Sequence, residues 1–147
     1  MRHVHHLTKI AQILGREIQW FFEDADNESS DAGPTPRDIG MARKFNRLAA
    51  EHARSQAPGG RFVIGSVGPT GEFLEPLGQV SEAEMYAAFV QQVTALEEGG
   101  ADGLVIETMT AIEEATLAIK AARENTKLPV IATMVFDKGP RGFFTMM

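Results

Sequence analysis

Residues 61–71 read RFVIGSVGPTG and residues 101–109 read ADGLVIETM, and each is a short apolar run flanked by glycines or polar residues. Short runs of this kind are typical of strands that are buried on both faces of a parallel sheet. A third run, PVIATMVF, occupies residues 129–136. The sequence therefore predicts three parallel strands, buried on both faces.

Helical patterns separate the three runs. Ser81 followed by Glu84 is a capping box, and the apolar positions after it continue to a glycine pair at Gly99 and Gly100. Thr110 is expected to cap a second helix. The small apolar face of that helix comprises Ala111, Ala115, Ala118, Ile119 and Ala122. The order is βαβαβ, which stacks right-handed into an open sheet or a (β/α)8 barrel.

The chain ahead of the first strand has two parts. Residues 1–23 carry apolar side chains at helical spacing, and residues 23–37 form an acidic loop rich in Asp, Ser, Gly and Pro. Asp38 is predicted to cap a further helix that ends before Pro58. Its predicted apolar stripe comprises Ile39, Ala42, Phe45, Leu48, Ala49 and His52 or Ala53. We therefore divide the chain into residues 1–37, a helix with an acidic linker, and residues 38–147, a helix followed by the βαβαβ segment.

Composition excludes several classes of function. Lys and Arg number 14 against 20 Asp and Glu, and the net charge of −6 excludes a basic nucleic-acid footprint. The chain has no cysteine, which excludes disulfides, a thiol nucleophile and thiolate-bound zinc within these residues. No apolar run approaches the roughly 20 residues that span a bilayer, and the N-terminus has no signal-peptide core. We expect a soluble cytoplasmic protein without a membrane or nucleic-acid partner.

Candidate chemistry lies where the predicted strands end, because that edge of a parallel sheet collects loops and helix N-termini. After the first strand come Gly68, Pro69 and Thr70, in a glycine-rich loop whose amides could face an anion. The loop lacks the GK[ST] ending of a phosphate-binding loop and the GxGxxG spacing of a dinucleotide turn. Both a ligand-binding loop and a tight turn therefore remain open from the pattern alone.

Glu107 directly follows three aliphatic residues of the second strand. A carboxylate at this position must be solvated, paired or functional, because burying it alone costs several kcal/mol. The alternatives are that Glu107 caps a helix or pairs with a nearby Lys. Asp137 follows the third strand in the equivalent position, although the adjacent Lys138 favours a solvated loop charge. The histidines at positions 3, 5 and 6 are predicted to lie on a frayed terminus rather than bind metal.

The motifs FVIGSVGPTGEFLEPLG, GGADGLVIETMTAIEEATLAIKAARE and LPVIATMVFDKGPRGFFTMM occur in the order and spacing of a known family. From Ile39 to Met147 the chain resembles the homocysteine S-methyltransferase domain of cobalamin-dependent methionine synthase and betaine-homocysteine methyltransferase. The resemblance implies a (β/α)8 barrel, of which about three parallel βα units are recognisable here. It also implies an enzyme that transfers a methyl group to the homocysteine thiol and so makes methionine.

In that family zinc, held by three cysteine thiolates after strands six and eight, activates the homocysteine thiol. This chain contains neither those segments nor any cysteine, so we expect an incomplete domain that holds no cofactor and is inactive alone. Zinc, and a methyl donor that can be cobalamin-linked, would belong to the complete enzyme. The resemblance assigns no catalytic or metal-binding residue to this chain.

The resemblance does imply substrate contacts. Glu107 matches the carboxylate that binds the amino group of homocysteine, and Gly68, Pro69 and Thr70 match the loop that shapes the amino-acid pocket. Asp137 lies at the family's strand-five edge. Unpaired strand edges would favour self-association or a complementing chain. Two alternatives stay open: a non-catalytic binding or assembly fragment, and a phosphate- or nucleotide-binding βαβ module.

Overall fold

A computed structural model of the chain describes residues 36–145. The helix expected over residues 1–23, most of the acidic segment and the three N-terminal histidines lie outside the described residues. The description concerns the second of two units, Asp38–Met147. Among the described residues, no helix combines the length and apolar character that crossing a membrane requires.

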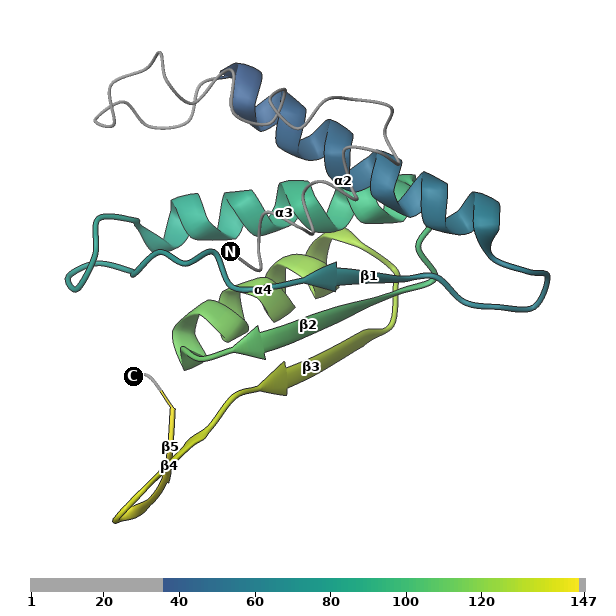
Figure 1. Ribbon diagram of the computed structural model, residues 1–147. Coiled ribbons are helices and arrows are strands. Elements are labelled where there is room, and N and C mark those ends of the chain that lie inside the picture. Colours follow the sequence, from purple (N-terminus) through teal and green to yellow (C-terminus); the bar gives the residue numbers. More distant parts are fainter. Residues whose placement is uncertain (1–35, 146–147) are drawn as a thin grey trace, which may run out of the picture. The chain divides into compact units, whose positions relative to one another are not determined.

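Three parallel strands form one sheet in the order β1-β2-β3. Two helices join them, and both cover the same face of the sheet (Figure 1). These elements are β1 (Ile64–Val67), α3 (Glu82–Glu98), β2 (Gly103–Met109), α4 (Ile112–Asn125) and β3 (Val130–Met134). The predicted alternation of parallel strands and helices is confirmed.

The ends of α3 follow the sequence signals, whereas the start of α4 does not. The Ser81–Glu84 capping box is present with both of its hydrogen bonds, and Gly99 caps the C-terminus. Hydrogen bonds from the Ser81 side chain and backbone hold the pKa of Glu84 below its ordinary value. The prediction that Thr110 caps α4 is wrong: Ala111 is the N-cap, without a side-chain bond. Because β2 continues to Met109, the chain enters the helix one residue later than predicted.

The core lies between the sheet and the two helices. It is built from large side chains of α3 and β2 packed against small side chains of α4, which keeps the helices close to each other and to the sheet. The largest fully buried residues are Phe89, Met85, Leu104, Ile106, Met109, Val67 and Val93. Ala115, Ala118 and Ala122 of the predicted α4 face are buried, as is Ala121.

The opposite face of the sheet is open among the described residues. Ile64 is 45% and Ile131 57% exposed, and Ser66 and Thr133 on the same face are also exposed. The prediction that the strands are buried on both faces is therefore wrong for this part of the chain. The reason is that α3 and α4 cover the same face. Such a face is expected of a barrel interior, where alternate side chains of each strand point inward.

Helix α2 (Pro36–Gln56) begins two residues ahead of Asp38, so Asp38 does not cap it. The predicted apolar stripe is correct only in part: Phe45 and Leu48 are half-buried, but the other described members are not. Ala42, Ala49 and Ala53 are exposed, whereas Ala50 is buried. Ala50 is buried because α2 approaches Gly99, at the end of α3, very closely. A Cβ added to Gly99 would lie only 2.6 Å from the Cβ of Ala50.

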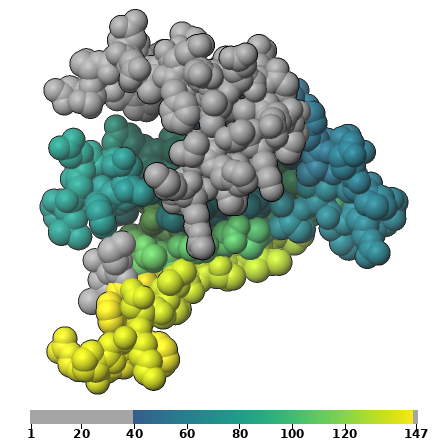
Figure 2. Space-filling view, viewed as in Figure 1, coloured from purple at the N-terminus to yellow at the C-terminus, as the bar shows by residue number. Residues whose placement is uncertain are grey.

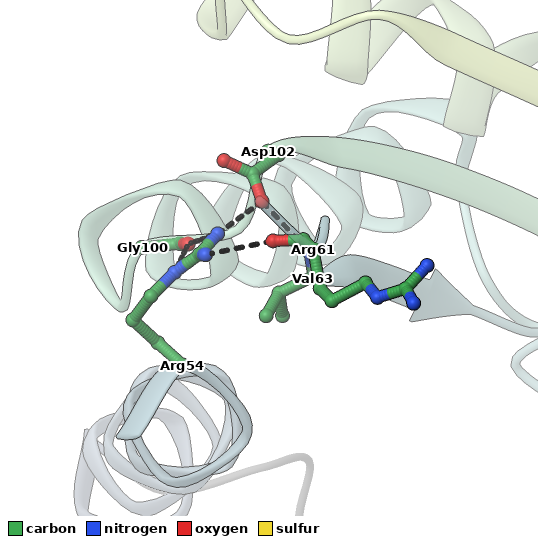
Figure 3. A network of polar contacts seen from close by, with 5 residues as sticks. All are labelled: Arg54, Arg61, Val63, Gly100 and Asp102. Atoms are coloured by element: carbon green, nitrogen blue, oxygen red, sulfur yellow. Dashed lines mark hydrogen bonds and ion pairs between the residues drawn. The ribbon is translucent and has the colours of Figure 1, made fainter. Parts of the chain in front are cut away.

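A polar network ties α2 to the start of two strands (Figure 3). Arg54 donates hydrogen bonds to the carbonyl oxygens of Gly100 and Arg61 and pairs with Asp102. The Val63 N–H donates to the same Asp102 carboxylate at 2.7 Å. The bond from Val63, followed by that from Arg54, lowers the pKa of Asp102. This network lies at the amino-terminal end of the sheet, just ahead of β1 and β2.

After β3 the chain forms a hairpin that the sequence did not predict. Strand β4 (Asp137–Gly139) pairs antiparallel with β5 (Gly142–Phe144). Figure 2 shows this segment, coloured yellow, projecting from the helices and the sheet. Phe143 is 73% and Phe144 57% exposed, so the aromatic side chains of β5 are largely accessible.

Candidate functional site

The predicted site residue Glu107 lies at the carboxyl end of the central strand, β2. Its half-buried side chain accepts a hydrogen bond at Oε1 from the Ser66 hydroxyl, with a donor–acceptor distance of 2.5 Å. Ser66 belongs to β1, and its own burial pattern places it on the open face of the sheet. The structure therefore directs the Glu107 carboxylate to the open face rather than toward a helix. The helix-capping alternative for Glu107 has no support, because the cap of α4 is Ala111.

A bulge in β2 lies at Glu107 itself and changes the alternation of the residues that follow it. Ile106 pairs with Ala132 and Met109 pairs with Met134, so that Glu107 and Thr108 together lie opposite Thr133. The inserted residue shifts the alternation of the strand: Ile106 and Met109 both face the core, while Glu107 remains on the open face. The bulge therefore gives Met109 the core face that Thr108 would otherwise take, and bulges are over-represented next to active sites.

Thr108, the second residue of the bulge, has a strained backbone conformation. Its φ is 63°, in the left-handed region that β-branched residues rarely adopt. The Thr108 N–H donates a hydrogen bond to the Thr133 hydroxyl of β3 at 3.4 Å, which is one of the contacts that hold the bulge. Strain of this kind concentrates at functional sites, where the surrounding structure maintains it. The strained residue therefore lies directly beside Glu107, near the carboxyl end of β2.

The loop after β1 is fixed by a residue that the sequence reasoning missed. Both the backbone N–H and the hydroxyl of Thr70 donate hydrogen bonds to Glu114 Oε1, each at 2.6 Å. Glu114 lies in the first turn of α4 and is only 5% exposed. The sequence could have indicated this burial, because Glu114 precedes Ala118 by four residues. That spacing places Glu114 on the same helix face as the buried alanines. A carboxylate on that face needs a partner, and Thr70 supplies it.

Gly68 and Pro69 connect β1 to Thr70, and because β1 and β2 are parallel neighbours, these three residues lie at the same sheet edge as Glu107. Gly68 is half-buried, and an added Cβ there would meet no atom within 4 Å. Asp137 is placed differently. It begins β4 of the hairpin, is exposed, and pairs with Phe144. The structure therefore brings together Glu107, Ser66 and the loop, but does not add Asp137 to the Ser66–Glu107 contact.

The arrangement of the loop argues against phosphate binding. An anion site needs free amides directed at the ligand, and the Thr70 amide is already bonded to Glu114. The buried Glu114 carboxylate also places negative charge beside the loop. The glycine-rich sequence of this loop was consistent with phosphate binding. In the structure the loop instead contacts a carboxylate of the same chain, Glu114.

The zinc that the resemblance implies has no suitable ligands among these residues. The sequence contains no cysteine, and residues 36–145 bring together no group of three His, Asp or Glu side chains that could hold a metal ion. The thiolate set of the family therefore does not fit this chain, and no step of a reaction is assigned to zinc here.

The protein is of the α/β class, with parallel strands and a carboxylate at the carboxyl edge of its sheet, and such a fold does not by itself identify a function. Comparison with known protein families identifies the family to which the chain belongs. The family model described as homocysteine S-methyltransferase matches residues 28–145. The chain therefore belongs to the homocysteine S-methyltransferase family. The match begins ahead of Ile39, where the resemblance in the motifs begins.

Proposed function

We propose that this sheet edge binds the amino-acid portion of homocysteine, with Glu107 receiving its ammonium group. The observation that carries the proposal is the Ser66–Glu107 contact on the open face of the sheet. It places a carboxylate at the end of the central strand, where enzymes of the (β/α)8 class bind substrates. Family membership supplies the substrate class.

The chemistry of the contact supports this role. Ser66 occupies Oε1 of Glu107, and among residues 36–145 no other hydrogen bond to this carboxylate is present. The second oxygen is therefore free to accept a charge-assisted hydrogen bond from an ammonium group. Ser66 acts as a positioning residue because its hydroxyl restricts the rotation of the carboxylate. The loop from Gly68 to Thr70, held by Glu114, forms the neighbouring wall in this proposal.

These residues bind and orient an amino acid, and we assign to them no step of the methyl transfer itself. In the proposal, thiolate-bound zinc and the methyl donor, cobalamin-linked or not, come from outside the residues named here. Asp137 is a further candidate for contact with substrate through movement of the exposed hairpin.

The test is a titration of the full chain with homocysteine and with 4-mercaptobutanoate, which lacks the ammonium group. Removing the charge by Glu107→Gln is expected to weaken homocysteine binding by about 10-fold or more, since hydrogen bonds to charged groups contribute about 1.5–3 kcal/mol. The des-amino analogue should bind wild-type protein and variant equally weakly. Glu82→Gln, at an exposed position on α3, is the matched control. Equal homocysteine affinity in wild type and Glu107→Gln would remove Glu107 from the site.

A further inference from the structure

A cavity of about 230 Å³ lies between the loop after β1 and the first turns of α3 and α4. Most of its exposed lining is apolar, and its buried wall is Met85, which is only 2% exposed. Apolar side chains of the loop complete the lining: Phe73, Leu74, Pro76 and Leu77. We call this cavity the loop pocket. It is separate from the Ser66–Glu107 contact, because neither of those residues lines it.

Four carboxylates line the loop pocket, and no Lys, Arg or His does so. Glu72, Glu75 and Glu113 are exposed at its rim, whereas Glu114 is 5% exposed. Thr70 occupies Oε1 of Glu114, and Oε2 accepts no hydrogen bond from any residue between 36 and 145. The pocket thus combines an apolar wall with four carboxylates, and its lining contains no basic side chain that would pair with them.

We propose that the loop pocket binds a small organic cation with an apolar body, such as an amine or a quaternary ammonium compound. The apolar lining would bury the body of the ligand, and the carboxylates would complement its charge. Phe73, which is half-exposed, adds an aromatic ring of the kind that attracts such cations.

Other ligand classes match the lining less well. A neutral apolar ligand would displace water from the carboxylates without replacing its hydrogen bonds, which is unfavourable. An anion would meet four like charges. A divalent metal ion prefers six or more oxygen ligands in place of apolar side chains, and no group suited to a metal occurs in the described part of the chain. Charge complementarity therefore selects an organic cation.

The experiment compares choline with its neutral isostere 3,3-dimethylbutan-1-ol, using the full chain and the methyl signal of Met85 in ¹H–¹³C NMR spectra. Choline is expected to shift this signal saturably, and the neutral compound to bind at least about 5-fold more weakly, the ratio that loss of cation–π and rim ion-pair contacts gives. Equal binding of the two compounds would overturn the proposal. So would saturable binding of magnesium chloride at this signal, or no shift with choline.

Rim variants separate the charge of the pocket from its shape. Glu75→Gln and Glu113→Gln change exposed side chains, so both variants should fold, and each should weaken choline binding by about 2- to 5-fold. The control Glu82→Gln lies outside the lining and should bind choline as the wild type does. Unchanged choline affinity in both rim variants would contradict the proposal. The outcome is independent of homocysteine binding at Glu107.

Discussion

Replacing Glu114 by glutamine tests whether its carboxylate holds the loop that follows β1. Thr70 donates its N–H and its hydroxyl to Oε1, each at 2.6 Å. A hydrogen bond to a charged acceptor contributes about 1.5–3 kcal/mol and a neutral one about 0.5–1.5 kcal/mol, so each bond loses about 1 kcal/mol in Glu114→Gln. Thr70 is exposed, so water can replace part of this loss. We therefore expect the free energy of local opening to fall by about 1 kcal/mol in total, which is about a 5-fold change in the opening equilibrium.

The assay is hydrogen exchange at the Thr70 amide, followed by NMR spectroscopy. Exchange at Thr70 should be about 5-fold faster in Glu114→Gln than in the wild type, whereas amides in the centre of β2 should be unchanged. Glu113→Gln is the matched control, because Glu113 is the preceding residue, is exposed, and makes no hydrogen bond among residues 36–145. If Thr70 exchanged at the same rate in both variants, the inference that Glu114 fixes the loop would be refuted.

Three further predictions concern the remainder of the fold. Gly99→Ala should lower the free energy of unfolding by about 1–3 kcal/mol in urea denaturation, because its Cβ would lie 2.3 Å from the Arg47 carbonyl oxygen. Gly40→Ala, whose Cβ meets nothing within 4 Å, should raise it by about 0.5–1 kcal/mol, and destabilisation by both would contradict the packing of α2. The pKa of Asp102 is lowered in the folded chain, so its contribution to stability is present above about pH 4 and is lost as the pH falls through the lowered pKa. The difference in Tm between wild type and Asp102→Asn should accordingly shrink in acid; a difference independent of pH would contradict this. Metal analysis after dialysis should find no stoichiometric zinc, since the chain has no thiolate ligand, and one tightly held zinc per chain would overturn that expectation.

The local features of the fold could be predicted because neighbouring residues determine them. The Ser81–Glu84 box spans one helical turn, and the glycines at positions 99 and 100 end the same helix. The apolar runs of β1, β2 and β3 each follow a glycine or a proline and need no knowledge of distant residues to be identified as strands. The start of α4 was misplaced by one residue, because the length of β2 depends on its pairing with β3.

The face of each element that is buried could not be predicted in the same way. A continuous apolar run is equally consistent with one or two covered faces, and only the placement of α3 and α4 on one side leaves Ile64 and Ile131 exposed. The buried face of α2 was predicted only in part for the same reason. Ala50 is buried because Gly99, 49 positions along the chain, lets the helix approach at that point.

For the site, the sequence alone determined that a carboxylate, Glu107, follows an apolar strand and that a glycine-rich loop follows the strand before it. Tertiary structure decided what these groups contact. Ser66 lies 41 positions from Glu107, and Thr70 lies 44 positions from Glu114. Strand pairing brings the first pair together, and the docking of α4 brings the second. The bulge at Glu107 and Thr108 is likewise defined only by the pairing of β2 with β3, and it places Met109 on the core face. Hydrogen bonds between residues so far apart depend on the register of the sheet, which no local pattern of side chains encodes.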